Sequence, residues 1–360
     1  MTLLANSTKP AATARRRGTI SVPAVTLAHG GGGSAMRNLV DDVFVSAFDN
    51  PYLDSLEDQA RFSLAGLARF GDRLAFTTDS YVIDPLFFPG GDIGKLAVCG
   101  TINDLAVGGA VPLYLTCGAI IEEGLEVDTL RAVAKSMAVT AAGAGVQIVT
   151  GDTKVVHKGT CDKLFLNTAG IGIIREGIDL GAGRCRPGDA VLVNGMLGDH
   201  GAAILAARGD MALATAIESD CAALHGLVCC LLKAAPGTRF IRDATRGGLA
   251  TVLNEAARAS NTGIRVSETA IPMREDVKAF CEILGLDPLY LANEGKIVCV
   301  VPEDELNTAL ETMRAHPLGH QAAIIGRVTV GEPGRVVMDT AFGGQRIVDM
   351  LVGDQLPRIC

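Results

Sequence analysis

The sequence contains no tryptophan, and aromatic residues make up only 4% of it. The core must therefore be built mainly from Ala, Val, Leu and Ile. No uninterrupted apolar run is long enough to span a bilayer, so no membrane-spanning helix is expected. Acidic residues outnumber basic ones, which gives a net charge of -8. This balance argues against a nucleic-acid partner, because nucleic acid attracts basic surfaces.

The ten cysteines are scattered along the chain, and no Cys-x-x-Cys motif occurs. This distribution does not fit the disulfide framework of a small secreted domain, and it supports neither a zinc knuckle nor a dithiol redox site. We expect a cytoplasmic protein with reduced, mostly buried thiols. Cys360 is the exception, because it is the last residue and follows Pro-Arg-Ile. A thiol at a mobile chain end is accessible for chemistry, whereas a packing cysteine belongs inside a helix or strand.

The standard nucleotide and hydrolase signatures are also missing. The run Gly90 to Leu96 resembles a P-loop, but its glycine spacing is wrong and Leu96 stands where a Ser or Thr must reach magnesium. No G-x-S-x-G or H-E-x-x-H motif occurs. On its glycines alone, Gly30 to Gly33 is interpreted as a linker rather than a phosphate-binding lid.

With 360 residues, the chain is long enough for two domains. A loop rich in Gly, Arg and Pro, Gly181 to Gly188, is the best boundary between them. Apolar periodicity predicts helices and strands in both halves, so we expect an α/β or α+β enzyme. The predicted helices span 53–70, 93–107, 127–142, 199–208, 221–234, 248–259, 275–284 and 303–314. The predicted strands span 73–83, 111–121, 146–156, 163–174, 190–194, 264–267, 296–301, 323–330 and 335–338.

Carboxylates recur on loops or strand ends beside Gly, Thr or Asn. Each of them alone is typical of a turn or a helix cap. Together they suit magnesium that bridges a polyphosphate, because Mg²⁺ prefers hard oxygen ligands. Asn103 precedes Asp104, and Arg246 follows Asp243 by three residues. We include both in the predicted nucleotide site. The carboxylates of that site are Asp58, Asp79, Asp104, Asp152 and Asp243, and the predicted metal ligands are Asp58, Asp79, Asp104 and Asp243.

Lys154 and Glu294 are candidates for acid–base chemistry. Lys154 follows Asp152 by two positions, so both side chains lie on the same face of a predicted strand. A lysine there can neutralise phosphate or, once desolvated, act as a base. Glu294 precedes a predicted strand and can reach a cleft from its loop. For both residues the alternative is a surface ion pair, and their spacing does not decide between the two.

Five segments resemble the hydrogenase maturation factor HypE family. They are Thr77 to Ala110, Val149 to Val156, Asp243 to Ala250, Ala292 to Lys296 and the terminal Pro-Arg-Ile-Cys. This family belongs to the ATP-binding superfamily typified by aminoimidazole ribonucleotide synthetase and selenophosphate synthetase. The resemblance covers about residues 36 to 360. It implies a two-domain PurM-like fold and a homodimer formed through the sheet of a β-rich N-terminal domain.

The loop at Gly181 to Gly188 and the extent of the resemblance, from which residues 1–35 depart, divide the chain into ranges. Residues 1–35 would be a flexible extension, 36–180 an ATP-binding and dimerisation domain, 184–350 a mixed α/β domain, and 351–360 a mobile tail. The tail would carry the acceptor Cys360.

The implied function is the preparation of cyanide ligands for the iron of nickel–iron hydrogenase. A carbamoyltransferase, HypF, would load a carbamoyl group onto the Cys360 sulfur. ATP with Mg²⁺ would then drive its dehydration to a thiocyanate, with Lys154 or Glu294 as the base. The HypC–HypD complex would accept the cyanide.

Two alternatives remain at this stage. A selenophosphate or aminoimidazole ribonucleotide synthetase is one, but the former uses a reactive residue near its N-terminal glycines, and here no cysteine precedes Cys99. The latter has no use for a terminal thiol. The other alternative is a nucleotide-responsive scaffold whose tail only docks a partner, which an ATPase assay on carbamoylated and unmodified protein would distinguish from an enzyme.

Overall fold

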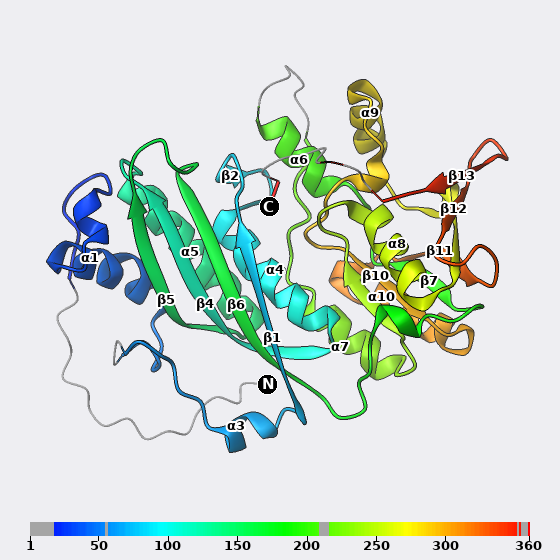
Figure 1. The fold of residues 1–360 in the computed structure, drawn as a ribbon, viewed down its shortest axis with the longest axis horizontal. Coiled ribbons are helices and arrows are strands. Elements are labelled where there is room, and N and C mark those ends of the chain that lie inside the picture. Colours follow the sequence, from blue (N-terminus) through cyan, green and yellow to red (C-terminus); the bar gives the residue numbers. More distant parts are fainter. Residues whose placement is uncertain (1–17, 55–56, 209–215, 351–352, 354–358) are drawn as a thin grey trace.

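The computed structural model describes residues 18–54, 57–208, 216–350, 353 and 359–360. Two sheets, each backed by helices, lie beside one another and are joined along the helix α4, Ile93–Val107 (Figure 1). This arrangement is the two-domain mixture of strands and helices that the sequence predicts.

The N-terminal sheet has the strand order β1-β6-β4-β5. Strand β6 is antiparallel to both β1 and β4, whereas β4 and β5 are parallel. A parallel pair needs a crossover, and here the helix α5 provides it. Helices α4 and α5 pack on one face of this sheet. The bounds are Arg73–Tyr81 for β1, Ala110–Glu122 for β4, Gln147–Val156 for β5, Leu164–Ile174 for β6 and Val127–Ala144 for α5.

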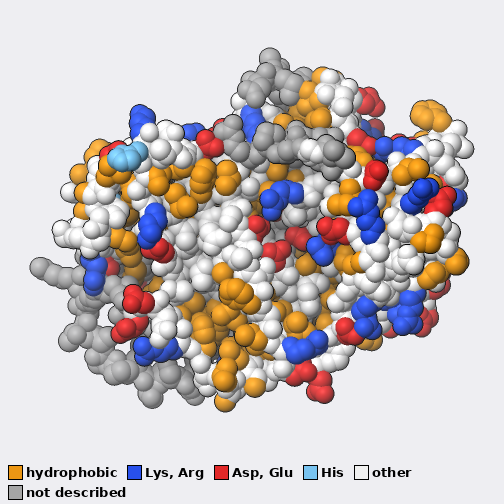
Figure 2. Space-filling model, viewed as in Figure 1, with side chains coloured by type: hydrophobic (Ala, Val, Ile, Leu, Met, Phe, Trp, Pro, Cys, Tyr) orange, Lys and Arg blue, Asp and Glu red, His pale blue; other side chains and the backbone are white. Residues whose placement is uncertain are grey.

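The opposite face of this sheet, which we call the open face, carries exposed apolar side chains. Alternate residues of β1 point to it, among them Leu74 and Phe76, which are 63% and 68% exposed. Ile120 on β4 is also exposed. Figure 2 shows apolar side chains gathered over the lower part of this face. Large exposed apolar patches of this kind mark interaction surfaces.

The C-terminal sheet has seven strands in the order β13-β12-β9-β11-β7-β10-β8. Its central strands β7 and β10 are buried on both sides, because α8 covers one face while α7 and α10 cover the other. In β7, Val191 and Val193 contact the α8 side, and Leu192 contacts the α7 side. The strand bounds are Ala190–Val193 (β7), Phe240–Asp243 (β8), Gly263–Ser267 (β9), Ile297–Val301 (β10), Ala323–Thr329 (β11), Val336–Asp339 (β12) and Gln345–Val348 (β13). The helix bounds are His225–Ala234 (α7), Gly248–Ser260 (α8) and Leu306–Ala315 (α10).

Shorter elements complete the described chain. The helices are Ser34–Leu39 (α1), Ser46–Phe48 (α2), Leu64–Ala68 (α3), Asp199–Ala207 (α6) and Glu275–Leu284 (α9), with a π-helix at Val40–Val45 (η2). The 3-10 turns are Leu27–Gly30 (η1), Ala182–Arg184 (η3), Glu268–Ala270 (η4), Pro288–Tyr290 (η5), Glu303–Glu305 (η6) and Pro317–Gly319 (η7). Phe87–Phe88 (β2) and Gly91–Asp92 (β3) form a small ribbon.

Helix α4 is mostly apolar and is buried on nearly all sides, because both domains pack on it. It contacts β1, β4 and β6 in one domain and α7 and β8 in the other. Asp92 caps its N-terminus by accepting from the backbone N–H groups of Gly94 and Lys95 at 2.7 and 3.2 Å. The segment that resembles a P-loop is therefore the capped start of a buried helix.

Most predicted elements are confirmed, and the helix over 93–107 has the predicted bounds. The helix predicted over 53–70 is wrong, because only Leu64–Ala68 is helical in its described part. Phe62, in the irregular part of this segment, contacts the sheet instead. The Phe62 ring stacks on Tyr114 of β4 with 4.2 Å between centroids, and Tyr52 lies edge-on to Tyr114. The spacing of apolar residues alone does not distinguish an irregular segment that packs on a sheet from an amphipathic helix.

The predicted extension, residues 1–35, is described from Gly18 onward. In that part it packs on the N-terminal domain rather than lying free of it. Val25 is buried, and its backbone N–H donates to the Leu125 carbonyl at 2.8 Å. The remainder of the extension, and residues 351–352 and 354–358 of the predicted tail, lie outside the described residues.

Candidate active site

The chain ends between the two domains (Figure 1). The backbone N–H of Val82 donates to the Cys360 carbonyl at 3.1 Å, and Ile359 forms an antiparallel bridge with Ile83. On its other side, the Ile359 carbonyl lies 2.8 Å from Nε2 of His200. Ile359 is buried, with 5% of its surface exposed. The end of the tail is thus seated in the protein in an extended conformation.

Cys360 lines a cavity of about 270 Å³, which we call the carboxylate pocket. The acidic side chains come from both domains and from elements distant in sequence. They are Asp79 on β1, Asp104 on α4, Asp243 at the end of β8, and Glu294 in the loop before β10. Arg246 also lines the pocket and lies 3.8 Å from Asp79.

Burial, together with neighbouring carboxylates, raises the pKa values of Asp104, Asp243 and Glu294. Burial, then the charges of Asp243 and Asp79, raise the pKa of Asp104 to about 7. Burial is also the main cause that raises the pKa of Asp243 to about 6, and Asp79 adds to it. Burial, followed by Asp243, Asp220 and Asp79, raises the pKa of Glu294 well above its ordinary value. A carboxyl group whose pKa lies near 7, as that of Asp104 does, exchanges protons near neutral pH, as acid–base catalysis requires.

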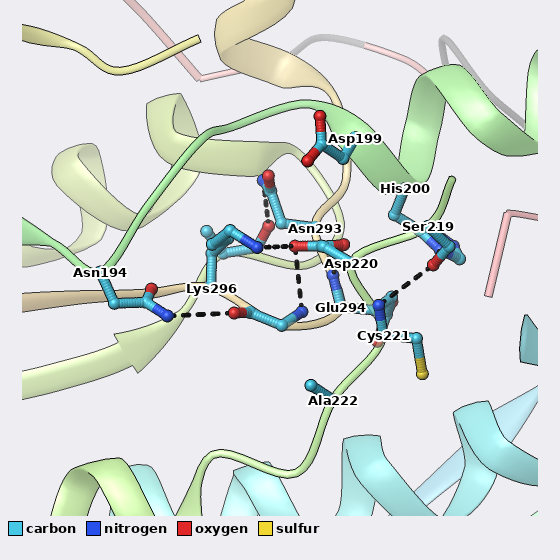
Figure 3. Close-up of polar contacts among 12 residues, drawn as sticks. Asn194, Asp199, His200, Ser219, Asp220, Cys221, Ala222, Asn293, Glu294 and Lys296 are labelled. Carbon is cyan, nitrogen blue, oxygen red and sulfur yellow. Dashed lines mark hydrogen bonds and ion pairs between the residues drawn. The ribbon is translucent and has the colours of Figure 1, made fainter. Parts of the chain in front are cut away.

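Glu294 is held in place by a neighbour that the sequence reasoning missed. Asp220 accepts from the backbone N–H groups of Glu294 and Gly295 at 2.9 and 3.2 Å, and from Lys296 Nζ at 2.9 Å (Figure 3). Burial disfavours the charge on Asp220, but Lys296 and these hydrogen bonds outweigh burial, and its pKa is lowered. This buried ion pair fixes the loop that presents Glu294. In the sequence, only the position of Lys296 two residues after Glu294 hints at this ion pair.

A second and larger cavity, of about 760 Å³, lies at the β5 edge of the N-terminal sheet. Asp58, Asp152, Thr150 and the backbone of Gly32 and Gly33 line it. The glycine run interpreted as a linker therefore borders a cavity. The position of Gly32 and Gly33 beside this cavity cannot be inferred from the sequence, because it depends on how the chain folds against β5.

Lys154 lies on β5 beside this second cavity. Its Nζ forms an ion pair with Asp152 at 2.7 Å, and its side chain is 65% exposed. Asn103, also predicted to bind nucleotide, is buried instead. Its amide nitrogen donates to the Ala222 carbonyl at 3.0 Å, and its oxygen accepts from the Leu224 N–H at 2.7 Å. Through these hydrogen bonds, the Asn103 side chain holds α4 against the 220–224 segment.

Comparisons with known proteins agree with this geometry. Residues 58–174 match the N-terminal domain, and residues 186–339 the C-terminal domain, of the AIR synthase related proteins. The chain is 61% identical over 336 residues to a carbamoyl dehydratase HypE from Rhodobacter capsulatus, which covers 93% of this chain and 98% of that one. The chain belongs to the carbamoyl dehydratase HypE family. It is accordingly a carbamoyl dehydratase of hydrogenase maturation.

Solved structures of HypE proteins have the same fold. A crystal structure of HypE in complex with ATP matches with a TM-score of 0.88 and 50% identity, covering 93% of this chain and 99% of that one. A crystal structure of a HypE–HypF complex matches with a TM-score of 0.75 and 46% identity, covering 89% of this chain and 100% of that one. The predicted PurM-like, two-domain fold is confirmed, and the selenophosphate and aminoimidazole ribonucleotide synthetase alternative is not favoured.

Apart from the buried Asn103, the predicted HypE site residues fall into two sets within one chain. The carboxylate pocket unites Asp79, Asp104, Asp243, Arg246, Glu294 and Cys360. The β5 edge holds Asp58, Asp152 and Lys154. Among the described residues, no three His, Cys, Asp or Glu side chains are arranged to hold a metal ion. No helix in that part of the chain is both long and apolar enough to cross a membrane.

Proposed function

We propose that the enzyme uses ATP to convert an S-carbamoyl group on Cys360 into a thiocyanate, the source of cyanide for the iron of nickel–iron hydrogenase. The position of Cys360 in a pocket of titratable carboxyl groups carries this proposal. A thiol that only docked a partner would have no need of acid–base groups beside it.

The chemistry removes one water equivalent from the group S–C(=O)–NH₂. The carbamoyl oxygen attacks the γ-phosphorus of ATP, and ADP leaves. Two N–H protons are then lost while the carbon–oxygen bond breaks, so that inorganic phosphate departs and S–C≡N remains. Glu294 is the group in the pocket suited to accept a proton from nitrogen, because a carboxyl with a raised pKa is a stronger base once ionised.

The donor chemistry of the pocket fits Mg²⁺, which takes one or two carboxylates and completes its shell with water and phosphate oxygens. Asp79, Asp104 and Asp243 are the candidates to supply these one or two carboxylates, and the ion would neutralise charge on the polyphosphate. An arrangement of only one or two protein ligands per ion is consistent with the lack of a three-residue metal cluster in the described chain.

A homodimer paired through the open face would unite the two residue sets. Strands β1 and β5 are the two edges of the same sheet. A two-fold axis between stacked sheets and parallel to their strands would place β5 of one copy over β1 of the other. Asp58, Asp152 and Lys154 of one copy would then face the carboxylate pocket of its partner, with ATP between them. The exposed Leu74, Phe76 and Ile120 suit such an interface.

The partners follow from the chemistry and the relatives. One related protein forms a HypE–HypF complex, and we propose HypF as the source of the carbamoyl group here. The HypC–HypD complex would accept the cyanide, in the cytoplasm. Each transfer requires Cys360 to leave the carboxylate pocket, so the tail must alternate between a seated and a released position.

The test is intact-protein mass spectrometry after incubation with HypF, carbamoyl phosphate and Mg·ATP. The unmodified protein should gain a carbamoyl mass that becomes a cyano mass. Cys360→Ala should gain neither, while the buried Cys99→Ala serves as the matched control and should gain both. A modified Cys360→Ala protein would rule out the terminal thiol as acceptor.

A further inference from the structure

His200 is a fully buried histidine that contacts the end of the tail directly. It lies at the start of α6, and none of its surface is exposed. Its Nε2 is 2.8 Å from the Ile359 carbonyl, and its Nδ1 is 2.8 Å from Oγ of Ser219. Phe88 packs edge-on against the imidazole, with 5.6 Å between ring centroids. The ring is therefore fixed on three sides.

The hydrogen bonds around His200 have only one consistent direction in the neutral ring. A carbonyl can only accept, so Nε2 carries the proton and donates to Ile359. Nδ1 is then an acceptor, and the Ser219 hydroxyl donates a hydrogen bond to it. Oγ of Ser219 in turn accepts from the Cys221 N–H at 3.2 Å. Burial lowers the pKa of His200, which favours this neutral form.

The same short segment holds both the tail and Glu294. Ser219 orients His200, and the adjacent Asp220 binds the Glu294 backbone (Figure 3). Ser219 is itself fixed, because its N–H donates to the Pro89 carbonyl at 2.8 Å. The distance between the seated thiol and the candidate base is thus set by two neighbouring residues of one buried segment.

We propose that His200 is a positioning residue that seats the loaded tail beside Glu294, and so acts on dehydration but not on carbamoyl loading. The inference rests on the proposed function. The pairing of Ile359 with Ile83 holds one side of the tail, and His200 holds the other. Loading by a partner enzyme takes place on the released tail, where His200 makes no contact.

Two rates test this assignment. The first is alkylation of Cys360 by iodoacetamide, followed as the mass of the tail peptide, which reports seating without any catalysis. The second is single-turnover formation of thiocyanate from carbamoylated, nucleotide-free protein after addition of Mg·ATP. Removing the donor leaves the Ile359 carbonyl unsatisfied, so His200→Leu should alkylate about tenfold faster and dehydrate about tenfold more slowly. Its carbamoyl loading rate and its ATP affinity should match the unmodified protein.

Three further variants separate positioning from damage to the fold. His200→Gln restores an N–H donor near Nε2 and should recover most of both rates. His225→Leu removes a partly buried histidine at the first residue of α7, which does not line the carboxylate pocket, and should change neither rate. Ser219→Ala should move both rates in the direction of His200→Leu by a smaller factor, and it decides the question if His200→Leu does not fold.

Unchanged alkylation and dehydration rates in His200→Leu, or in Ser219→Ala when that variant decides, would overturn the proposal. If the unmodified protein forms no thiocyanate at all, the proposed function fails, and alkylation still tests the seating of the tail by itself.

Discussion

Lys154 and Cys360 are predicted to act together, although they are far apart within one protomer. Lys154 lies on β5 and Cys360 beside β1, and β6 and β4 separate these two edge strands. Three inter-strand steps span about 14 Å, more than a lysine side chain reaches. Lys154 also points to the open face, whereas Asp79 of the carboxylate pocket alternates with the open-face residues of β1. We therefore predict that Lys154 acts on the seated Cys360 of a second copy.

Mixed dimers of Lys154→Ala and Cys360→Ala test this prediction. With equal amounts and random pairing, about half the dimers are mixed, and each mixed dimer has one complete site if the lysine acts across the interface. Thiocyanate formation should then reach about a quarter of the activity of unmodified protein. If Lys154 acted within its own chain, no site would be complete and activity would be absent. Each variant alone should be inactive in the assay.

A third substitution makes the refuting result unambiguous. Phe76→Asp, on the open face, should abolish the complementation and convert the protein to a monomer by light scattering. Phe342→Asp is the matched control, since Phe342 is fully exposed in the hairpin between β12 and β13 and should affect neither readout. No thiocyanate from mixed dimers that scatter as dimers would show that Lys154 is not a trans-acting residue.

Three further predictions concern the carboxylate pocket and its support. Glu294→Gln keeps the shape of the base but cannot accept the proton, so the carbamoylated protein should accumulate and dehydration should fall by about 10²–10⁴-fold, with loading unchanged. Asp104→Asn should weaken Mg·ATP binding by about tenfold in calorimetric titration, whereas Asp128→Asn, an exposed residue of α5, should not. Asp220→Asn leaves Lys296 buried without its partner and should lower the free energy of unfolding by about 3 kcal/mol at pH 7. The pKa of Asp220 is lowered by folding, so its stabilisation is full above the ordinary carboxyl range and is lost as pH falls below that range. Urea unfolding of both proteins at pH 7 and at about pH 2 measures this, and an equal difference at both would contradict it.

Local patterns determined the elements that depend on local interactions. Asp92 caps α4, and the long apolar run after it has the length of a buried helix, so its bounds could be predicted. Strands β4 to β6 follow from their apolar content and their glycine boundaries in the same way. The strand β8 is not predicted because two of its four residues, Arg242 and Asp243, are charged, and it is a strand chiefly because β10 pairs with it. The region around Phe62 was assigned to a helix because its contact, Tyr114, is distant in sequence.

For the candidate site, too, some features could be predicted from the sequence and others depend on the tertiary structure. The residue types that favour proton transfer and magnesium could be chosen from the sequence, because a carboxylate beside Gly or Thr has the same chemistry wherever the chain folds. Which carboxylates meet could not, since Asp79, Asp104, Asp243 and Glu294 converge only when α4 joins the two domains. The separation of Lys154 from Cys360 and the contact between His200 and the tail were decided by the tertiary structure alone, because both depend on strand order and on hydrogen bonds between residues far apart in the chain.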